Sequence, residues 1–165
     1  MKFYILSVCL LLSTTYLSAQ AYEGRGDQKF QVGANLQSNG TGIMTSYDYG
    51  LGENISIGAT STYLLGVNES VSASTWDRFD AKARFSAHLG NIIGLGDQVD
   101  IYPGLDLGLK NFGFHMGARF FFSDGLGVFT EFGFPIAKYK TENLEPAEKL
   151  HNQFMVNIGA VFNFL

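Results

Sequence analysis

The sequence predicts an all-β protein: an eight-stranded antiparallel up-and-down transmembrane β-barrel. Apolar and polar residues alternate with a period of two through eight segments of the 165-residue chain. Each segment is about 9 to 13 residues long, near the length that a tilted strand needs to cross a bilayer. The composition agrees, because 20 glycines, 15% aromatic residues and only 16% charged residues are unusual for a soluble domain.

The first four segments alternate regularly, with an apolar face opposite a polar or Gly-rich face. Turn signals follow the first segment at Asn39-Gly40 and the second at 52–54, and a longer polar stretch, 67–76, follows the third. The apolar faces are, in order, Phe30, Val32, Ala34 and Leu36; Ile43, Thr45, Tyr47, Tyr49 and Leu51; Ile55, Ile57, Ala59, Ser61, Tyr63 and Leu65; and Phe79, Ala81, Ala83, Phe85, Ala87 and Leu89.

The last four segments continue the pattern. A Gly-rich link, 90–97, comes before them, and a tight turn at 110–111, a turn at 123–125 and a long polar stretch, 139–151, separate them. Their apolar faces are Ile101, Pro103, Leu105, Leu107 and Leu109; Phe112, Phe114, Met116, Ala118, Phe120 and Phe122; Leu126, Val128, Thr130, Phe132, Phe134 and Ile136; and Phe154, Val156, Ile158, Ala160, Phe162 and Phe164. Because proline cannot donate to a ladder, we expect bulges at Pro103 and Pro135.

The N-terminus has the pattern of a secretory signal peptide. Lys2 supplies positive charge, residues 3–12 form an apolar run too short to span a bilayer, and small polar residues follow. Cleavage after Ala19 and cleavage after Ala21 both fit this pattern. The single cysteine, Cys9, lies inside the leader, so the mature chain would have no thiol chemistry.

These features predict three parts of the chain: a signal peptide over 1–19 (alternative end 21), an N-terminal segment over 20–27 and one barrel domain over 28–165. If both termini face the periplasm, the long polar loops after the third and seventh segments lie outside the cell. The net charge of −4 gives no support for nucleic-acid binding.

The aromatic residues of the apolar faces fall into two bands, as the girdles of a membrane barrel do. The band expected near the periplasmic rim holds Phe30, Tyr47, Tyr49, Phe120, Phe122, Phe162 and Phe164; that near the outer rim holds Tyr63, Trp76, Phe79, Phe112, Phe114, Phe134 and Phe154. We therefore assign Phe85 to lipid and Arg84 to the lumen. Alternation alone leaves open a secreted lipocalin-like binding barrel with its apolar face inward.

The polar faces predict a lumen filled by charged side chains, because eight strands leave room only for side chains. The expected polar network is Asp80, Lys82, Arg84, His88, Asp100, Asp106, His115, Arg119 and Glu131, and Lys29, Asp48 and Lys110 are further interior candidates. Acids and bases are nearly balanced, so we expect an ion-paired plug. A narrow gated channel is the alternative.

Little in the sequence indicates catalysis. His88 and His115 are expected at opposite ends of the barrel, which argues against a shared metal site. Ser86 and His88 lie two apart on one face, so that a lipid-modifying barrel enzyme is an alternative. There is no HExxH, P-loop, dinucleotide fingerprint or cysteine-based zinc motif. We therefore expect no enzyme activity, no cofactor and no metal.

The chain ends with Asn157, Gly159, Phe162 and Phe164 in a polar-x-Gly-x-x-aromatic-x-aromatic pattern, followed by Leu165. This pattern resembles the ending of bacterial outer-membrane barrels, which implies an assembly signal that the barrel-assembly machinery reads. The mature chain resembles small outer-membrane barrels of the OmpA and OmpX type. The Ala19-Gln20 junction and residues 47–54 look closest to uncharacterised outer-membrane barrels of Bacteroidetes.

The resemblance implies an integral protein of the bacterial outer membrane, exported through a cleaved signal peptide, with a structural or surface-interaction role and no specific activity. The partners that it implies are outer-membrane lipid, and the barrel-assembly machinery and periplasmic chaperones during biogenesis. We expect a monomer that binds no nucleic acid.

Overall fold

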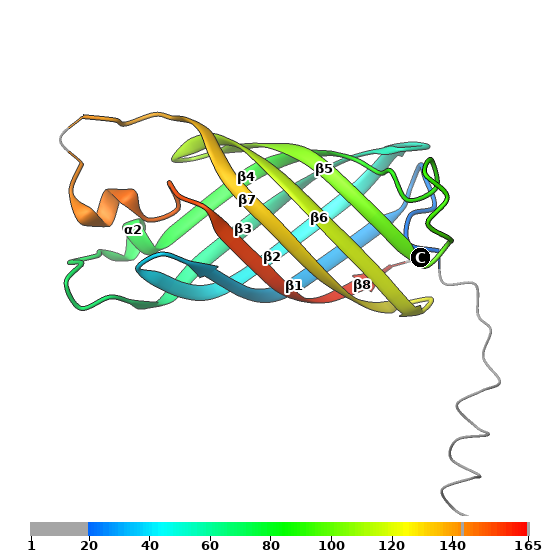
Figure 1. The fold of residues 1–165 in the computed structure, drawn as a ribbon, viewed down its shortest axis with the longest axis horizontal. Coiled ribbons are helices and arrows are strands. Elements are labelled where there is room, and N and C mark those ends of the chain that lie inside the picture. Colours follow the sequence, from blue (N-terminus) through cyan, green and yellow to red (C-terminus); the bar gives the residue numbers. More distant parts are fainter. Residues whose placement is uncertain (1–19, 143, 165) are drawn as a thin grey trace, which may run out of the picture.

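In the computed structural model, which describes residues 20–142 and 144–164, eight antiparallel strands close into one barrel (Figure 1). This confirms the predicted fold class. The strands are β1 (Gln28–Gln37), β2 (Gly40–Gly52), β3 (Ile55–Val67), β4 (Phe79–Ala87), β5 (Val99–Gly108), β6 (Asn111–Ser123), β7 (Leu126–Lys138) and β8 (Met155–Asn163). The expected signal peptide over 1–19 and Leu165 lie outside the described residues.

Each strand pairs with its neighbours in the sequence, and β1 pairs with β8 to close the barrel. Phe30 lies opposite Phe162 across this seam, and Gly33 lies opposite Gly159. The closed ring leaves no unpaired edge strand, which is how a barrel satisfies its backbone hydrogen bonds without water.

The two prolines have different effects on the ladders. Next to Pro135, the β6–β7 register shifts between Phe112 and Gly113, as expected for a bulge. The bulge expected at Pro103 is wrong, because the β5–β6 register runs through this residue without a shift. The β4–β5 ladder instead ends at the pair of Ser86 and Gly104. Pro103 therefore lies just outside this ladder, which does not require the N–H that proline lacks.

Both ends of the barrel carry long and short connections, and the long β4–β5 link, 88–98, lies at the end that holds the termini. The long loops after β3 and β7 lie at the end opposite the termini (Figure 1). The first of them contains a short helix, α2 (Thr75–Arg78), which Ser74 caps through a capping box with Asp77. The second contains a 3-10 helix, η1 (Pro146–Lys149). No helix among the described residues is long and apolar enough to cross a membrane.

The apolar faces of the strands point outward. In β4, Phe85 is 47% exposed and its neighbour Arg84 is 2% exposed. The same holds around the barrel for outward side chains such as Val32, Ile43, Ile57, Leu105, Met116, Phe132 and Ile158. The inside-out arrangement of a lipocalin-like barrel is therefore wrong for this chain.

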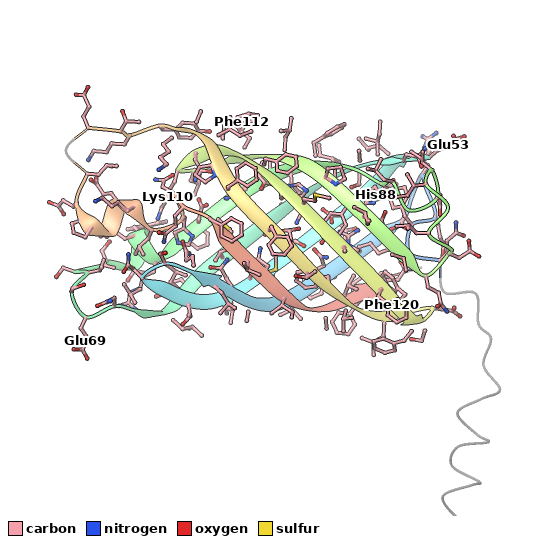
Figure 2. All side chains as sticks on the ribbon, viewed as in Figure 1. Glu53, Glu69, His88, Lys110, Phe112 and Phe120 are labelled. Atoms are coloured by element: carbon pink, nitrogen blue, oxygen red, sulfur yellow. The ribbon has the colours of Figure 1, made fainter. Side chains whose placement is uncertain are left out.

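Aromatic side chains stand on this outer surface near both ends. Figure 2 shows Phe112 and Phe120 pointing away from the barrel toward opposite ends, whereas His88 lies within it. Exposed aromatic residues near the end that holds the termini are Tyr47, Tyr49, Phe120, Phe122 and Phe164, and those near the other end are Trp76, Phe134, Tyr139 and Phe154. An apolar belt between two aromatic bands is the surface expected of a membrane barrel.

Candidate functional site: the polar lumen

The centre of the lumen holds a network of buried charges. Arg84 Nε lies 3.3 Å from Asp48 Oδ1, and Arg119 donates to Asp48 Oδ2. Arg84 also donates to Glu131 Oε2 at 2.6 Å, and Arg119 Nη1 lies 3.9 Å from Asp100 Oδ2. All five side chains are buried. Because they come from β2, β4, β5, β6 and β7, the network connects opposite walls of the barrel.

Tyr102 of β5 fills the space beside this network. The Arg119 guanidinium carbon lies 3.9 Å from the centre of the Tyr102 ring, as in a cation–π contact. Gln31 Nε2 donates to the Tyr102 hydroxyl at 3.0 Å. A Cβ atom on Gly117 would overlap the Tyr102 ring, so only glycine fits there. Sequence reasoning missed Tyr102 as a network member, although it stands on a polar face between Gly and Asp residues.

His115 of β6 forms a hydrogen-bonded relay with residues of β4 and β5. Its Nδ1 atom lies 2.9 Å from Asp106 Oδ1, and its Nε2 atom lies 3.0 Å from Ser86 Oγ. The register of the three strands explains this arrangement. Ser86 of β4 lies opposite Gly104 of β5, and Gly104 lies opposite His115 of β6. The missing side chain at Gly104 leaves the space that the His115 ring occupies.

His88, just after β4, forms a second relay of the same kind. Its Nδ1 atom lies 2.6 Å from Asp100 Oδ2, and its Nε2 atom lies 2.8 Å from Ser56 Oγ. The ring centres of His88 and His115 lie 6.2 and 6.1 Å from that of Tyr102. The expectation that the two histidines lie at opposite ends is therefore wrong, because the stagger of β4, β5 and β6 brings both beside one tyrosine.

The Ser86–His88 pairing on which the enzyme alternative rests does not form, since each histidine takes a serine from another strand. Both relays have the Ser–His–Asp hydrogen-bond order of serine hydrolases. Catalysis also requires a space for substrate beside the serine oxygen and donors for an oxyanion. Ser86 is 0% exposed and Ser56 is 1% exposed. The relays therefore act as buried hydrogen-bond networks that satisfy both ring nitrogens of each histidine.

The N-terminal segment closes the mouth of the barrel near the termini. The Tyr22 hydroxyl donates to Ile55 O at 2.6 Å and lies 3.0 Å from Gly52 O. Its ring stacks on His88 with centroids 3.6 Å apart and an angle of 6° between the planes. Tyr22 therefore ties the segment both to the rim and to the buried relay.

Charged groups stabilise the same mouth. Lys29 Nζ donates to Asp27 Oδ2 at 2.6 Å and to Asn163 Oδ1 at 2.9 Å, which joins the N-terminal segment to β1 and β8. Burial, with the nearby carboxylates of Asp27 and Asp100, raises the pKa of the Tyr22 hydroxyl to about 12. Tyr22 therefore keeps its proton at neutral pH and remains a donor.

The long loops close the opposite mouth. They pack against each other through a small apolar cluster: Leu64, Val71, Ala147 and Leu150. Asn111 Nδ2 donates to His151 O and to Asn152 Oδ1, each at 2.9 Å. The His151 N–H donates to Gln37 Oε1 at 2.9 Å, and its ring Nε2 lies 3.0 Å from Arg78 O. His151 is thus the residue through which the loop before β8 is fixed to β1, β6 and α2.

The stability of this closed mouth should depend on pH. Burial, together with the positive charges of Lys110 and Lys82, lowers the pKa of His151 from 6.5 to about 3. Between these two pKa values the unfolded chain binds a proton that the folded chain does not. The contribution of His151 to the free energy of unfolding is therefore complete above about pH 6.5 and falls as the pH drops toward 3. Denaturant midpoints in micelles should fall less on acidification in His151→Asn than in the natural chain. Asparagine tolerates the backbone φ of 62° at this position. Identical pH profiles would contradict a neutral, buried His151.

All the residues of the expected network are buried except Lys82, which is half-buried. The pairs cited above include all of them except Asp80 and Lys82. These two lie at the outer end of β4, with Lys82 Nζ 3.9 Å from Asp80 Oδ2. Lys110, a further candidate, instead lies in the β5–β6 turn and donates to Asp77 O at 2.7 Å. Among the described residues, no group of three or more His, Cys, Asp or Glu is placed to hold a metal ion.

The residues of the C-terminal pattern divide between the two faces of β8. Asn157 faces inward, accepts from Asn35 Nδ2 at 2.6 Å and donates to Glu131 Oε1 at 3.2 Å. Phe162 and Phe164 lie on the outer side, with ring centres 6.4 and 6.3 Å from that of Phe30. Gly159 lies opposite Gly33 at the seam, where a Cβ atom would meet the backbone of β1.

Comparisons with known proteins agree with this architecture. A family model described as a "Family of unknown function (DUF6646)" matches residues 12–164. No curated protein matches the chain significantly. Among solved structures, the N-terminal β-barrel domain of OprF from Pseudomonas aeruginosa is similar, with a TM-score of 0.59 and 12% identity over 86% of this chain and 100% of that chain.

Two further solved structures are similar. A barrel from the de novo design of transmembrane β-barrels has a TM-score of 0.57 and 11% identity, over 86% of this chain and 98% of that chain. The outer membrane protein Ail of Yersinia pestis has a TM-score of 0.46 and 10% identity, over 85% of this chain and 100% of that chain. The OprF domain and the designed barrel show that the fold is that of known transmembrane barrels.

Proposed function

The chain belongs to the DUF6646 family, whose function is unknown, and we propose that it is an integral outer-membrane barrel with a closed lumen and a structural or surface-interaction role. One observation carries the proposal: apolar side chains cover the outside of a barrel whose interior is filled by paired charges. In water, such a surface would expose a continuous apolar belt, which soluble monomers avoid. In a bilayer the same surface is the favourable one.

Location in the outer membrane, with export through a cleaved signal peptide, follows from the same proposal. Helical spans and closed barrels are the structures that satisfy all backbone groups in lipid. Barrels of this size and hairpin plan are typical of outer membranes of Gram-negative bacteria. The partners in this proposal are outer-membrane lipid, and periplasmic chaperones and the barrel-assembly machinery during biogenesis, with a monomer as the working form.

Fractionation of the host envelope tests this location. The protein should be recovered with the outer membrane and should show heat-modifiable mobility in gels, because a folded barrel resists detergent until it is heated. Recovery from the soluble periplasm, without a mobility change on heating, would contradict the proposal.

A structural or surface role is favoured over a channel because both mouths and the centre of the barrel are filled. Arg84, Arg119 and Asp48 cross the centre, Tyr22 closes one mouth, and the loop held by His151 closes the other. Such a plug should block the passage of ions. The two relays also give no support for a catalytic role, because their serines are buried.

Planar-bilayer recordings should accordingly show little or no steady conductance from the purified protein. Buried guanidinium groups that pair with two carboxylates each are held in place, since breaking such a pair leaves an uncompensated charge. Stable, well-defined open levels across independent preparations would favour the gated channel instead.

The C-terminal aromatics should direct assembly. Replacing Phe162 and Phe164 with Ser should leave export intact but lower the amount of folded barrel in the outer membrane. Folded yield can be measured as the heat-modifiable fraction in membrane extracts. Phe132→Ser/Phe134→Ser is the matched control, because these outward residues of β7 are 44% and 46% exposed and also face the belt. Equal yields from the two double variants would show that lost apolar surface, not a terminal signal, causes the defect.

A further inference from the structure

Among the described residues, Ala21 is the first whose side chain is buried in the barrel. Its side chain is 2% exposed, and its backbone N–H donates to Asp97 O at 2.6 Å. It belongs to an apolar cluster with one side chain each from β2, β6, β7 and β8: Met44, Phe121, Phe129 and Val161. Gln20, in contrast, is half-buried. Within the described residues, the buried part of this mouth's closure therefore begins at Ala21.

We propose that signal peptidase cleaves after Ala19, so that the assembled protein begins at Gln20 and keeps Ala21 as part of this plug. Cleavage after Ala21 would remove its contacts and place the new α-ammonium group on Tyr22. Tyr22 is 3% exposed, and its ring lies against His88. Placing a charged group beside this buried side chain would cost desolvation free energy, and the hydrogen bond from Ala21 N–H to Asp97 O would be lost.

The rest of the segment depends on the same anchor. Asn91 Nδ2 donates to Tyr22 O at 3.3 Å, and the Glu23 N–H donates to Asp27 Oδ2 at 2.7 Å. A strained or displaced Tyr22 would therefore disturb both the β4–β5 loop and the Asp27–Lys29 pair. The fold does not direct the peptidase, which acts before the barrel is assembled, but it shows which product completes the mouth.

The sequence leaves two cleavage bonds open, after Ala19 and after Ala21. Ala19-Gln20-Ala21 matches the A-x-A pattern, whereas a cut after Ala19 has Leu17 at the third position before the bond. The two products differ by two residues at the N-terminus, which makes the test sharp.

The inference rests on the proposed export, and one experiment separates the two. The full chain is expressed in a Gram-negative host, the folded barrel is extracted from its outer membrane, and its intact mass and N-terminal sequence are measured. We expect a chain that begins at Gln20. A chain that begins at Tyr22 would overturn this inference alone. An uncleaved chain would overturn the proposed export as well.

A second measurement tests the structural reason. Chains that begin at Gln20 and at Tyr22 are refolded in the same detergent, and their unfolding temperatures are compared. The chain that begins at Tyr22 should unfold at a temperature lower by roughly 4 °C or more. Gln20→Ser in the longer chain is the control and should leave the temperature unchanged. Equal unfolding temperatures for the two chains would show that Ala21 is not part of a stabilising plug, and would overturn the proposal.

Discussion

Replacing Asp48 with Ala should destabilise the barrel by about 3–5 kcal/mol, because it leaves two buried guanidinium groups without their shared carboxylate. Arg84 would keep Glu131, and Arg119 would keep only Asp100, whose oxygen lies 3.9 Å from Arg119 Nη1. The loss should appear as a lower urea midpoint for unfolding from lipid vesicles. Asp48→Asn should cost nearly as much, since it preserves the size of the side chain and removes only its charge.

Ser46→Ala is the matched control for Asp48. Ser46 lies two residues away on the same inward face of β2 and donates to Gln31 Oε1 at 2.6 Å. Loss of one neutral hydrogen bond should cost about 1 kcal/mol. If Asp48→Ala costs no more than Ser46→Ala, the central charges are hydrated rather than paired, and the case for a closed lumen weakens.

Phe85→Arg should impair insertion into lipid strongly. Phe85 is 47% exposed on the outer face of β4, where it lies between Ile57 of β3 and Leu105 of β5 in the apolar belt. A charge at mid-bilayer on this face costs about 2–4 kcal/mol. The fraction folded after dilution from urea into vesicles should fall, whereas Phe85→Leu should fold almost normally because it keeps the surface apolar.

A residue at a different depth in the membrane provides a second control for this prediction. Leu109 is also outward and 64% exposed, but it lies at the tip of the β5–β6 hairpin. Near an interface, the same substitution by arginine costs only about 0–1 kcal/mol. Leu109→Arg should therefore fold much better than Phe85→Arg. Equal folding of the two variants would mean that this outer face does not contact lipid.

The number of strands, the turns and the side of the barrel to which each side chain points could be predicted from the sequence, because they depend on local spacing. The period of two assigns Arg84 and Phe85 to opposite faces whatever the partners of β4 are. The polarity of the loops also followed from composition. The contacts across the lumen could not be predicted, because they depend on how far each strand is staggered against the next. Ser86 therefore binds His115 rather than His88, which is nearer in the sequence.

The closure of the two mouths could not be predicted from the sequence either, but for a different reason. The segment that contains Tyr22 and the loop that contains His151 have no periodic pattern, since each is held by hydrogen bonds from irregular backbone. A tyrosine and a histidine in polar segments give no signal by themselves. Their burial becomes visible only when the walls that enclose them are in place.

The seam between β1 and β8 has a consequence for the order of folding. Lys29 and Asn163 are hydrogen-bonded across 134 residues of sequence, and no other strand can supply the partner that either end needs. Contacts between such distant residues form slowly, because the entropy of closing the loop is lost before the contact is gained. Closure must therefore wait until the whole chain has been delivered. A chain stalled before β8 would present two open edges, which are sites for aggregation in water and unsatisfied backbone in lipid.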